Sequence, residues 1–358
     1  PLRSKWGVFR DSLVRSTPRE GPDTYARVLQ RTLGRTLCES FYFPMSQKLW
    51  GVAPDEIDVE QARRRVSAQS PLGIVGKALL RLLRLSGQGG FFHYPESGFG
   101  EISKALAADV QRRGGKIRLG QPVRELRREP KCWGLGFDGD EETIQADLVF
   151  STIPLPALVK VLQPNAPDEV QSTARELRSR GVILVCLVLA REQWSRWDAH
   201  YLPARDIVVS RVSEPKNYQP AGPPSGRTGL CVEIPCDRDD QLWRRTDEDL
   251  LQLACDELDR AGLPHPEPLV DGLVRRLPSV YPVYDLQYRE RLARLQGYVD
   301  RQPSLVTLGR QGLFAHDNTH HALAMAWAAA ECVGGTGAWN ENRWKQETVA
   351  FASHVVED

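Results

Sequence analysis

The sequence predicts an α/β protein, built as one large domain or two interleaved ones, and three observations carry this prediction. The chain has 358 residues, of which 41% are hydrophobic, and this is enough for a substantial core. Apolar residues at helical spacing dominate the first 112 residues and give way to short extended runs after residue 117. Near the C-terminus a strand, a glycine-containing turn and an alanine-rich helix follow one another.

Charge and cysteine content limit the partners and the compartment. Lys and Arg number 47 against 46 Asp and Glu, mixed along the chain, so the net charge of +1 leaves no nucleic-acid footprint and favours small molecules and proteins as partners. The seven cysteines are scattered and never spaced CxxC, which favours free thiols in a reducing compartment. Neither a stretch of about 18 apolar residues nor a signal-peptide pattern occurs, so we expect a cytoplasmic protein.

Four helices are expected before residue 113. In the last of them Phe99, Ile102, Leu106 and Val110 recur at helical spacing, and Gly114 supplies a stop. Another of them carries a basic stripe opposite an apolar one, which predicts either a peripheral contact with an anionic membrane or a core-facing helix with a solvated back. The expected helices are 23–39, 59–68, 72–85, which carries the basic stripe, and 99–112.

A run of strands should follow this helical part. Trp133, Leu135 and Phe137 alternate up to Asp138-Gly139, which is a strong hairpin signal. A continuous apolar run at 148–150 predicts a strand buried on both faces. The strands expected here are 117–119, 123–127, 133–137, 143–145 and 148–150.

The second half of the chain is expected to form an antiparallel sheet with helices beside it. Segment 182–189 is strongly apolar and favours a strand, while 215–227 is rich in Pro and Gly and predicts a surface loop. The remaining expected strands are 207–212, 230–234, 269–277 and 305–308, and the expected helices are 247–261, 288–299, 318–333 and 340–356.

A literal GxGxxG pattern at Gly134, Gly136 and Gly139 does not predict a dinucleotide-binding loop. Such a loop needs a strand before the glycines and a helix directly after them, so that backbone N–H groups and the helix dipole meet the phosphates. Here an acidic turn over 138–142 follows, which would repel phosphate. We therefore reject this motif.

The strongest motif lies at 305–331. A strand runs into Gly309-Arg310, and a helix begins at Asn318. Glycine after a buried strand lets the backbone approach a ligand closely, and the helix N-terminus presents unpaired N–H groups to an electron-rich acceptor. An ordinary strand–turn–helix unit, with alanines for close packing, explains the same spacing.

The stretch GRQGLFAHDNTHHALAMAWAAAE resembles the C-terminal FAD-binding motif of the amine-oxidase-like flavoproteins. The resemblance is to the branch that contains protoporphyrinogen-oxidase-like proteins and UDP-galactopyranose mutase. Further segments agree with this family in order and rough spacing, and with the motif they cover nearly the whole chain. These segments are 41–51, 92–100, 115–123, 147–154 and 281–285.

This resemblance implies an incomplete FAD-binding Rossmann-like domain, assembled from separate pieces of the chain, with an inserted α+β substrate domain. The implied pieces are a helical part of the substrate domain at 1–95, strands and a meander of the FAD domain at 96–155, the sheet and helices of the substrate domain at 156–300, and the C-terminal part of the FAD domain at 301–358.

The resemblance also implies which residues would hold FAD. Val123 would contact the adenine through its backbone, and Gly309 and Arg310 would lie beside the pyrophosphate or the ribityl chain. The segment from Asn318 to Ala322 would approach the isoalloxazine ring. The implied cofactor-binding residues are Val123, Gly309, Arg310, Phe314, Asn318, His321 and Ala322.

The sequence departs from the family pattern at several positions. His320 stands where relatives often have an acidic residue, and Ala326-Trp327 stands where a small Gly is common. The family's N-terminal strand, glycine loop and helix are not found in the sequence, which starts at Pro1. Three explanations are open: the unit lies upstream in a longer gene product, the chain is complete and does not bind FAD in the usual way, or a complementing chain supplies the unit.

The implied function is FAD-dependent oxidation, with a hydride transferred from a small organic substrate to flavin N5. Since the cofactor carries the difficult step, no dedicated catalytic side chain is expected. Tyr281 and Tyr284 would form a substrate wall over the flavin, or else belong to the core. His316, His320 and His321 are expected to line the flavin site or the surface, because we find no metal-ligand spacing around them.

Two other functions stay open. One is a redox-neutral, flavin-dependent nucleotide-sugar mutase, and the other is a flavin-free binding or scaffold protein. The sequence contains no GxSxG, P-loop or HExxH motif, which argues against hydrolases and phosphotransferases.

Overall fold

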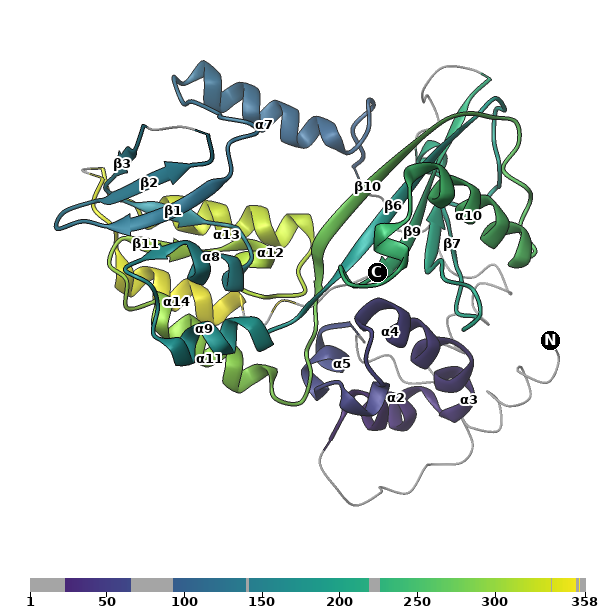
Figure 1. The fold of residues 1–358 in the computed structure, drawn as a ribbon, viewed down its shortest axis with the longest axis horizontal. Coiled ribbons are helices and arrows are strands. Elements are labelled where there is room, and N and C mark those ends of the chain that lie inside the picture. Colours follow the sequence, from purple (N-terminus) through teal and green to yellow (C-terminus); the bar gives the residue numbers. More distant parts are fainter. Residues whose placement is uncertain are drawn as a thin grey trace, which may run out of the picture.

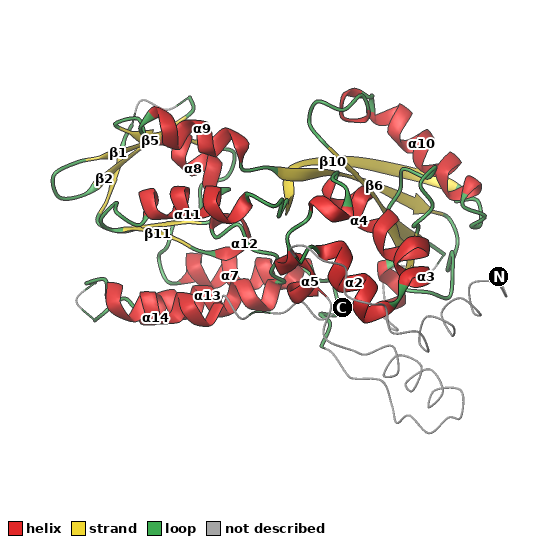
Figure 2. Cartoon of the chain, turned by 90° about the horizontal axis from the view of Figure 1, so that it is seen from below, coloured by secondary structure: helices red, strands yellow, loops and turns green. Residues whose placement is uncertain are grey.

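A computed structural model describes residues 23–65, 93–139, 142–218, 226–335, 337–351 and 354. It is a mixed α/β structure with parallel and antiparallel sheets, as the sequence predicts. Figures 1 and 2 show two lobes beside each other, one with a long antiparallel sheet and the other with shorter strands and most of the helices. The helix expected over 72–85, and with it the membrane interpretation, lies outside the described residues.

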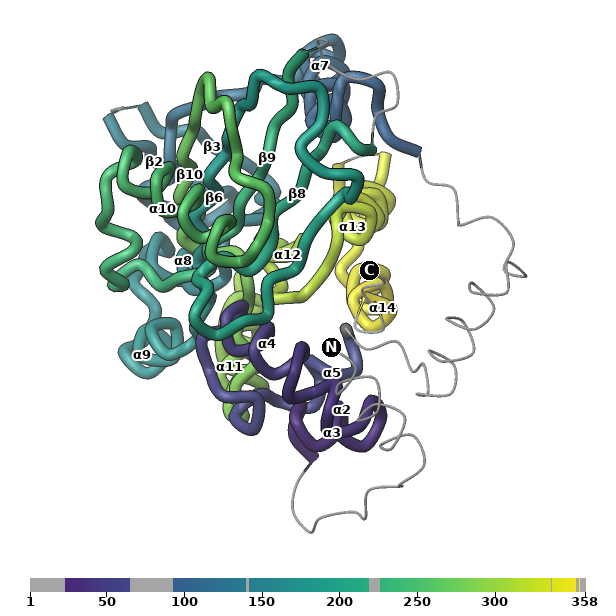
Figure 3. Tube along the Cα trace, turned by 90° about the vertical axis from the view of Figure 1, so that its right-hand side faces the viewer, coloured from purple at the N-terminus to yellow at the C-terminus, as the bar shows by residue number. Residues whose placement is uncertain are grey.

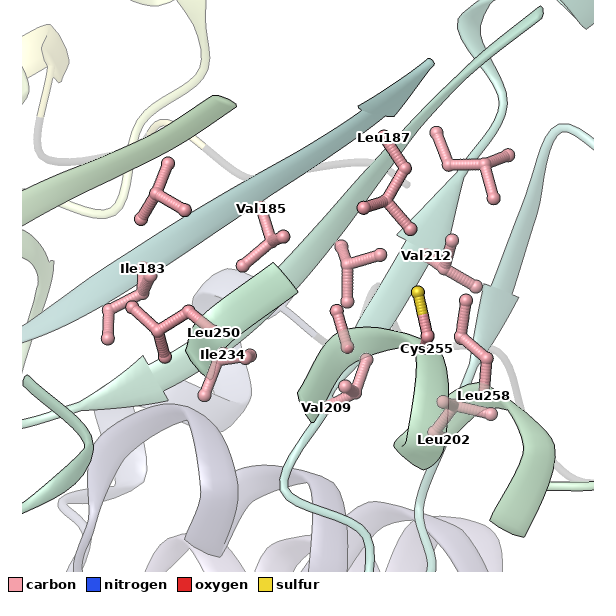
Figure 4. Packing of buried hydrophobic residues seen from close by; sticks show 14 of the residues in the cluster. Ile183, Val185, Leu187, Leu202, Val209, Val212, Ile234, Leu250, Cys255 and Leu258 are labelled. Atoms are coloured by element: carbon pink, nitrogen blue, oxygen red, sulfur yellow. The ribbon is translucent and has the colours of Figure 1, made fainter. Parts of the chain in front are cut away.

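The first lobe is organised by a five-stranded antiparallel sheet with the order β10-β6-β9-β8-β7. Alternation along β6 directs Ile183, Val185 and Leu187 into one buried cluster, which α10 completes with Leu250 (Figure 4). These elements are β6 (Ser179–Leu189), β7 (Ala199–Tyr201), β8 (Arg211–Ser213), β9 (Thr228–Cys236), α10 (Asp247–Arg260) and β10 (Leu269–Pro282).

The strand expected over 207–212 is shorter than predicted. The ladder begins only at Arg211, although Ile207 and Val209 are buried in the same cluster. Their apolar pattern therefore reflects burial in the core rather than strand pairing.

A helical subdomain precedes this sheet in the sequence and lies beneath it in Figure 3. Gly34, with φ of 83°, interrupts the single helix expected over 23–39. The Lys48 ammonium donates to the backbone carbonyls of Leu202 and Val209, which ties the subdomain to the sheet lobe. The helices are α2 (Tyr25–Leu33), α3 (Arg35–Leu37), a π-helix (Cys38–Tyr42), α4 (Phe43–Trp50) and α5 (Val59–Arg65).

The second lobe contains a four-stranded sheet with the order β3-β2-β1-β5, in which β1 and β5 are parallel. The hairpin expected at Asp138-Gly139 joins β2 and β3, and Gly139 adopts a φ of 76° there. Gly134 and Gly136 lie inside β2, so the rejection of the GxGxxG pattern as a phosphate loop is confirmed. These strands are β1 (Val123–Arg128), β2 (Trp133–Phe137), β3 (Ile144–Ala146) and β5 (Leu162–Gln163).

A separate parallel pair, β4 and β11, lies between two layers of helices. Leu305 packs with α8, α9 and α11, whereas Val306 packs with α13 and α14, because successive strand residues point to opposite faces. These elements are β4 (Val149–Ser151), α8 (Leu155–Val161), α9 (Asp168–Glu176), α11 (Tyr288–Val299), β11 (Leu305–Thr307), α12 (Gly309–Gly312), α13 (Thr319–Glu331) and α14 (Glu341–Phe351).

The core of this second lobe crosses two of the expected domain boundaries. Leu158 of α8 and Leu295 of α11 belong to the same buried cluster as Leu126 of β1 and Leu305 of β11. Boundaries at 156 and 300 would cut through this cluster, so packing groups α8, α9 and α11 with the second lobe.

Helix α7 (Gly100–Arg112) forms as predicted but buries none of its residues, and Leu106 is 51% exposed. Two neighbouring expectations are wrong. Segment 117–119 forms no strand, and Phe150 of β4 is 41% exposed, although its strand was expected to be buried on both faces. The apolar patterns of α7, of segment 117–119 and of β4 each predict burial against another element. The described residues do not provide the surface against which they would pack.

Two general expectations can be compared with the structure directly. Among the described helices, none combines the length and apolar character needed to cross a bilayer. All seven cysteines are free thiols, as their spacing predicts.

Candidate functional site

The candidate site lies at the carboxyl ends of β4 and β11. Because these strands are parallel, their carboxyl ends share one edge, which is where ligands bind in open α/β sheets. The backbone N–H of Leu308 donates to the carbonyl of Ser151 at 3.1 Å. A Cβ atom on Gly312 would lie 2.8 Å from that carbonyl oxygen, so only glycine allows this approach. The buried Oγ of Ser151 has no hydrogen-bond partner among the described residues.

Gly309 and Phe314 shape the turn after β11. Gly309 has a φ of 76°, which favours glycine, and Phe314 also has a positive φ of 51°. Phe314 is only 1% exposed and belongs to the core of the second lobe. The predicted cofactor residue Phe314 is therefore a buried support of the turn in this structure.

Arg310 is engaged with the protein itself. Its Nε and Nη2 donate to the carbonyl of Val280 at 3.2 and 3.0 Å, and its Nη1 donates to the carbonyl of Asp317 at 3.0 Å. The guanidinium also lies 5.6 Å from the ring centroid of Tyr281. Arg310 thus connects the end of β10 to the segment before α13.

The N-terminus of α13 follows directly. Asn318 is the N-cap, and its backbone N–H donates to Nδ1 of His321 at 3.2 Å. Burial lowers the pKa of His321, and the neighbouring His320 and His354 lower it further. Asn318, His321 and Ala322, all predicted from the motif, are half-buried at this helix start.

A buried carboxylate lies beside this helix start. The side chain of Asp317 is fully buried, with Nη1 of Arg64 at 3.9 Å and Nδ1 of His321 at 3.7 Å from Oδ1. Nδ1 of His354 lies 3.7 Å from the other carboxylate oxygen. The sequence interpretation missed Asp317, which lies just before the N-cap Asn318 and four residues before His321. It missed Arg64 and His354 because only the fold brings them here.

A cavity of about 620 Å³ opens along the free edge of β11. Asp317 and Arg64 line it together with residues of α11 and α14. Burial raises the pKa of Asp300 in this cavity, although Gln296 donates to the Asp300 carboxylate at 2.7 Å. The polar residues that line the cavity include Arg64, Gln296, Asp300, Thr307, Asp317, Glu341 and Lys345.

The other predicted residues lie apart from one another. Val123 is half-buried at the start of β1, in a different sheet from β11. Tyr284 is 3% exposed, stacks on Tyr288 with ring centroids 4.1 Å apart, and donates its hydroxyl to the carbonyl of Phe314 at 2.9 Å. Burial raises its pKa to about 12. Tyr281, half-buried beside Arg310, is the better placed of the two predicted substrate tyrosines.

The fold and this site define a two-lobed α/β protein with a ligand edge at the end of a parallel strand pair. The sequence pattern of the flavin-containing amine oxidoreductases matches residues 27–333. The chain belongs to this family. No curated protein sequence matches the chain.

Solved structures resemble the fold over most of its length. A reduced UDP-galactopyranose mutase superposes with a TM-score of 0.77 at 18% identity, over 97% of this chain and 76% of that chain. A candidate protoporphyrinogen oxidase from Exiguobacterium sp. 255-15 gives a TM-score of 0.63 at 20% identity, over 87% of this chain and 68% of that one. An oxidoreductase from Methanosarcina mazei gives a TM-score of 0.50 at 16% identity, over 87% and 68%.

The described residues fit one end of the cofactor that this family carries. Gly309 has a positive φ, and Gly312 admits the close approach of the Ser151 carbonyl at the strand ends. The buried Oγ of Ser151 has no hydrogen-bond partner among the described residues. A dinucleotide also needs a glycine loop that opens a helix beneath its pyrophosphate. The described residues contain no such loop after a parallel strand. The described residues therefore match the strand end and the helix start of such a site, and no glycine loop of this kind is among them.

Proposed function

We propose that this chain forms the substrate-binding and C-terminal cofactor-binding parts of an FAD-dependent oxidoreductase acting on a small organic substrate. The observation that carries the proposal is the shared edge at the ends of β4 and β11, where Gly309 has a positive φ and the missing Cβ of Gly312 lets the turn approach the Ser151 carbonyl closely. Membership of the flavin-containing amine oxidoreductases supports the same cofactor.

In this proposal the segment 309–322 lies beside the cofactor. The first N–H groups of α13 would stabilise negative charge on the ring system, because a helix N-terminus carries positive partial charge. Val123 would hold the adenine end through its backbone. Arg310 holds the segment in place through Val280 and Asp317, and Tyr281 would border the substrate. When bound, FAD would supply the acceptor for a hydride from a substrate C–H bond.

We also infer that firm FAD binding needs a strand–helix unit with a glycine loop, supplied upstream or by a complementing chain. One edge of β4 pairs with β11. Among the described strands, none pairs with the other edge of β4. Apolar side chains are exposed on α7 and its N-cap, on β4 and α13, and in the segments that follow α7 and β4, a liability unless another element covers them. They are Phe99, Leu106, Val110, Ile117, Leu119, Phe150, Ile153, Leu323 and Trp327.

An absorbance titration with FAD tests the proposal. The purified chain is incubated with excess FAD, desalted and examined for a protein-bound flavin band, and the experiment is repeated with upstream coding sequence restored. We expect weak retention by the chain alone and firm retention by the longer form. A Gly312→Val variant of the longer form should lose the band, while Gly100→Ala, at a glycine with open space around it, should keep it. The proposed site would be contradicted if Gly312→Val kept the flavin band, or if no form of the protein retained flavin.

A redox-neutral nucleotide-sugar mutase is the second candidate, favoured by the TM-score of 0.77 to the reduced UDP-galactopyranose mutase. The two activities differ in their need for an electron acceptor. Turnover of a candidate substrate that consumes oxygen without added reductant would support the oxidoreductase. Turnover that requires prior reduction of the flavin, with no net oxidation of the substrate, would support the mutase.

A flavin-free binding or scaffold protein is the third candidate. It predicts that no form of the chain retains FAD, while the fold stays intact by circular dichroism.

The cytoplasm remains our prediction for the compartment, supported by the free thiols.

A further inference from the structure

We propose that Asp317, His321 and His354 form a site for one divalent metal ion of the zinc type. Each residue offers one ligand atom, and these atoms all lie within 4.8 Å of one another. The three residues come from the segment before α13, from α13 itself and from the residues after α14. The site needs no FAD, since its three side chains already lie together in the chain, and it shares Asp317 and His321 with the segment 309–322 proposed to lie beside the cofactor.

The geometry is close to that of a bound ion. Nδ1 of His321 and Nδ1 of His354 each lie 3.7 Å from an oxygen of Asp317. Zinc binds imidazole nitrogen and carboxylate oxygen at about 2.1 Å, so ligands at a tetrahedral angle are about 3.4 Å apart. The two nitrogens lie near different oxygens of Asp317, and the three ligand atoms lie within 4.8 Å of one another, so contractions of up to about 1.4 Å would seat an ion on one shared oxygen. Two imidazoles and one carboxylate leave a fourth position for water or another ligand, as in an open zinc site.

Buried polar atoms in the cluster need a partner. Both carboxylate oxygens of Asp317 and Nδ1 of His354 are buried and have no hydrogen-bond partner among the described residues. The ion pairs of Asp317 with its neighbours, at 3.7 to 3.9 Å, are too long for hydrogen bonds. A buried carboxylate without donors is strongly unfavourable. One cation would satisfy one carboxylate oxygen of Asp317 and Nδ1 of His354 at once.

Three contacts oppose the ion. The rings of His321 and His354 stack with centroids 4.4 Å apart and an interplanar angle of 15°, so one ring must rotate before both nitrogens point at one ion. The other two contacts are weak. His321 already accepts the long 3.2 Å hydrogen bond from Asn318, and coordination through Nδ1 would release that N–H at the helix start. Arg64 places a positive charge 3.9 Å from Asp317, but its Nε donates to Glu60 at 3.1 Å, so this charge is already shared. Arg64 should therefore weaken the metal affinity without abolishing binding.

An ion also has a route to the site. Asp317 and Arg64 line the cavity of about 620 Å³ along β11. A route of entry and a set of ligands in a plausible geometry are the features a metal site must combine.

Metal titration of the purified chain tests the proposal without FAD. The protein is dialysed against a chelator, titrated with Zn²⁺ by calorimetry, and titrated with Co²⁺ to follow the visible bands of a four-coordinate ion. We expect one ion per chain, and a loss of affinity of at least about 100-fold in Asp317→Asn and His354→Gln, since even outer-shell changes cost about 10- to 100-fold. His265→Gln, at a surface histidine that contacts Asp259 and Glu267, should bind as the unaltered protein does.

Two results would overturn the proposal. One is the absence of stoichiometric binding by the unaltered chain. The other is binding that survives both ligand variants and disappears in His265→Gln, since His265 lies against Asp259 and Glu267 on the surface and could collect metal there. If the ligand variants fold poorly by circular dichroism, Arg64→Met decides: removal of its charge should tighten binding, and an unchanged affinity would contradict the site. Metal binding is measured without FAD and flavin retention without added metal, so each proposal can fail while the other stands.

Discussion

Arg310 donates two hydrogen bonds to the carbonyl oxygen of Val280, at 3.2 and 3.0 Å, and so fixes the end of β10 against the turn that follows β11. Its third bond, to the carbonyl of Asp317, extends this link to the start of α13. The side chain expected beside a pyrophosphate is thus also the connection between the sheet lobe and the candidate site.

Replacement of Arg310 by Met should lower the free energy of unfolding by about 2–3 kcal/mol, because charged hydrogen bonds are lost and carbonyl groups lose their donors. Arg294→Met is the matched control, since Arg294 forms exposed pairs with Glu169 and Glu290 and should contribute less than about 1 kcal/mol. Urea denaturation of both variants measures the difference. Equal losses would argue against a connecting role for Arg310.

Gly312→Ala should destabilise the strand edge by about 1–3 kcal/mol, because the new Cβ would lie 2.8 Å from the carbonyl oxygen of Ser151, and backbone must move to admit it. Gly100→Ala introduces the same methyl group where nothing lies within 4 Å. That control should be neutral or slightly stabilising at the start of a helix. Thermal unfolding of the pair gives the comparison, and a neutral Gly312→Ala would mean that the close approach is not present.

Tyr284→Phe should lower the free energy of unfolding by about 1 kcal/mol, since it leaves the Phe314 carbonyl without the tyrosine donor and keeps the stacked ring. Tyr288→Phe retains the same stacking and removes a hydroxyl for which the described residues record no hydrogen bond, so its effect should be smaller. A substrate role for Tyr284 would instead appear as a change in KM with unchanged stability, measured by steady-state kinetics of the flavin-loaded protein.

Lys48 should make stability depend on pH. Burial lowers its pKa from 10.5 to about 8 in the folded protein. Between these values the unfolded chain binds more protons, so the contribution of Lys48 to stability is fully present above pH 10.5 and is lost as the pH falls to about 8. In Lys48→Met the rise in stability between about pH 8 and pH 10.5 should vanish. Lys104→Met, at an exposed helix position, should keep this rise. Parallel pH curves for the unaltered protein and Lys48→Met would contradict the predicted shift.

The sequence predicts most of the fold where the pattern and the packing agree. Residues 288–299 form α11 as expected, and the apolar segment 182–189 lies in β6, because their buried faces meet partners inside the chain. Alternation and helical periodicity indicate which side chains are expected to be buried against another element. Where no described element packs against such a face, the same patterns give wrong predictions. Phe150 is exposed although it was expected to be buried, and segment 117–119 forms no strand.

The candidate site was only partly predictable. The motif at 309–322 marks the strand end and the helix start, which are local features. Arg64 of α5 and His354 approach Asp317 only in the folded chain, and no local pattern encodes that meeting. The close approach of Gly312 to Ser151 likewise depends on the pairing of two strands far apart in the sequence.

Hydrogen exchange in the exposed helix α7 can be used to detect assembly of this protein with another component. Because α7 buries no residue, its backbone amides can open without breaking tertiary contacts, and they should exchange with deuterium faster than those of α10, where Leu250, Ala254 and Leu258 are buried. Any element that covers Leu106 and Val110 would slow this exchange. Assembly with a second component can therefore be followed by mass spectrometry on peptides of α7, with no label attached to either molecule.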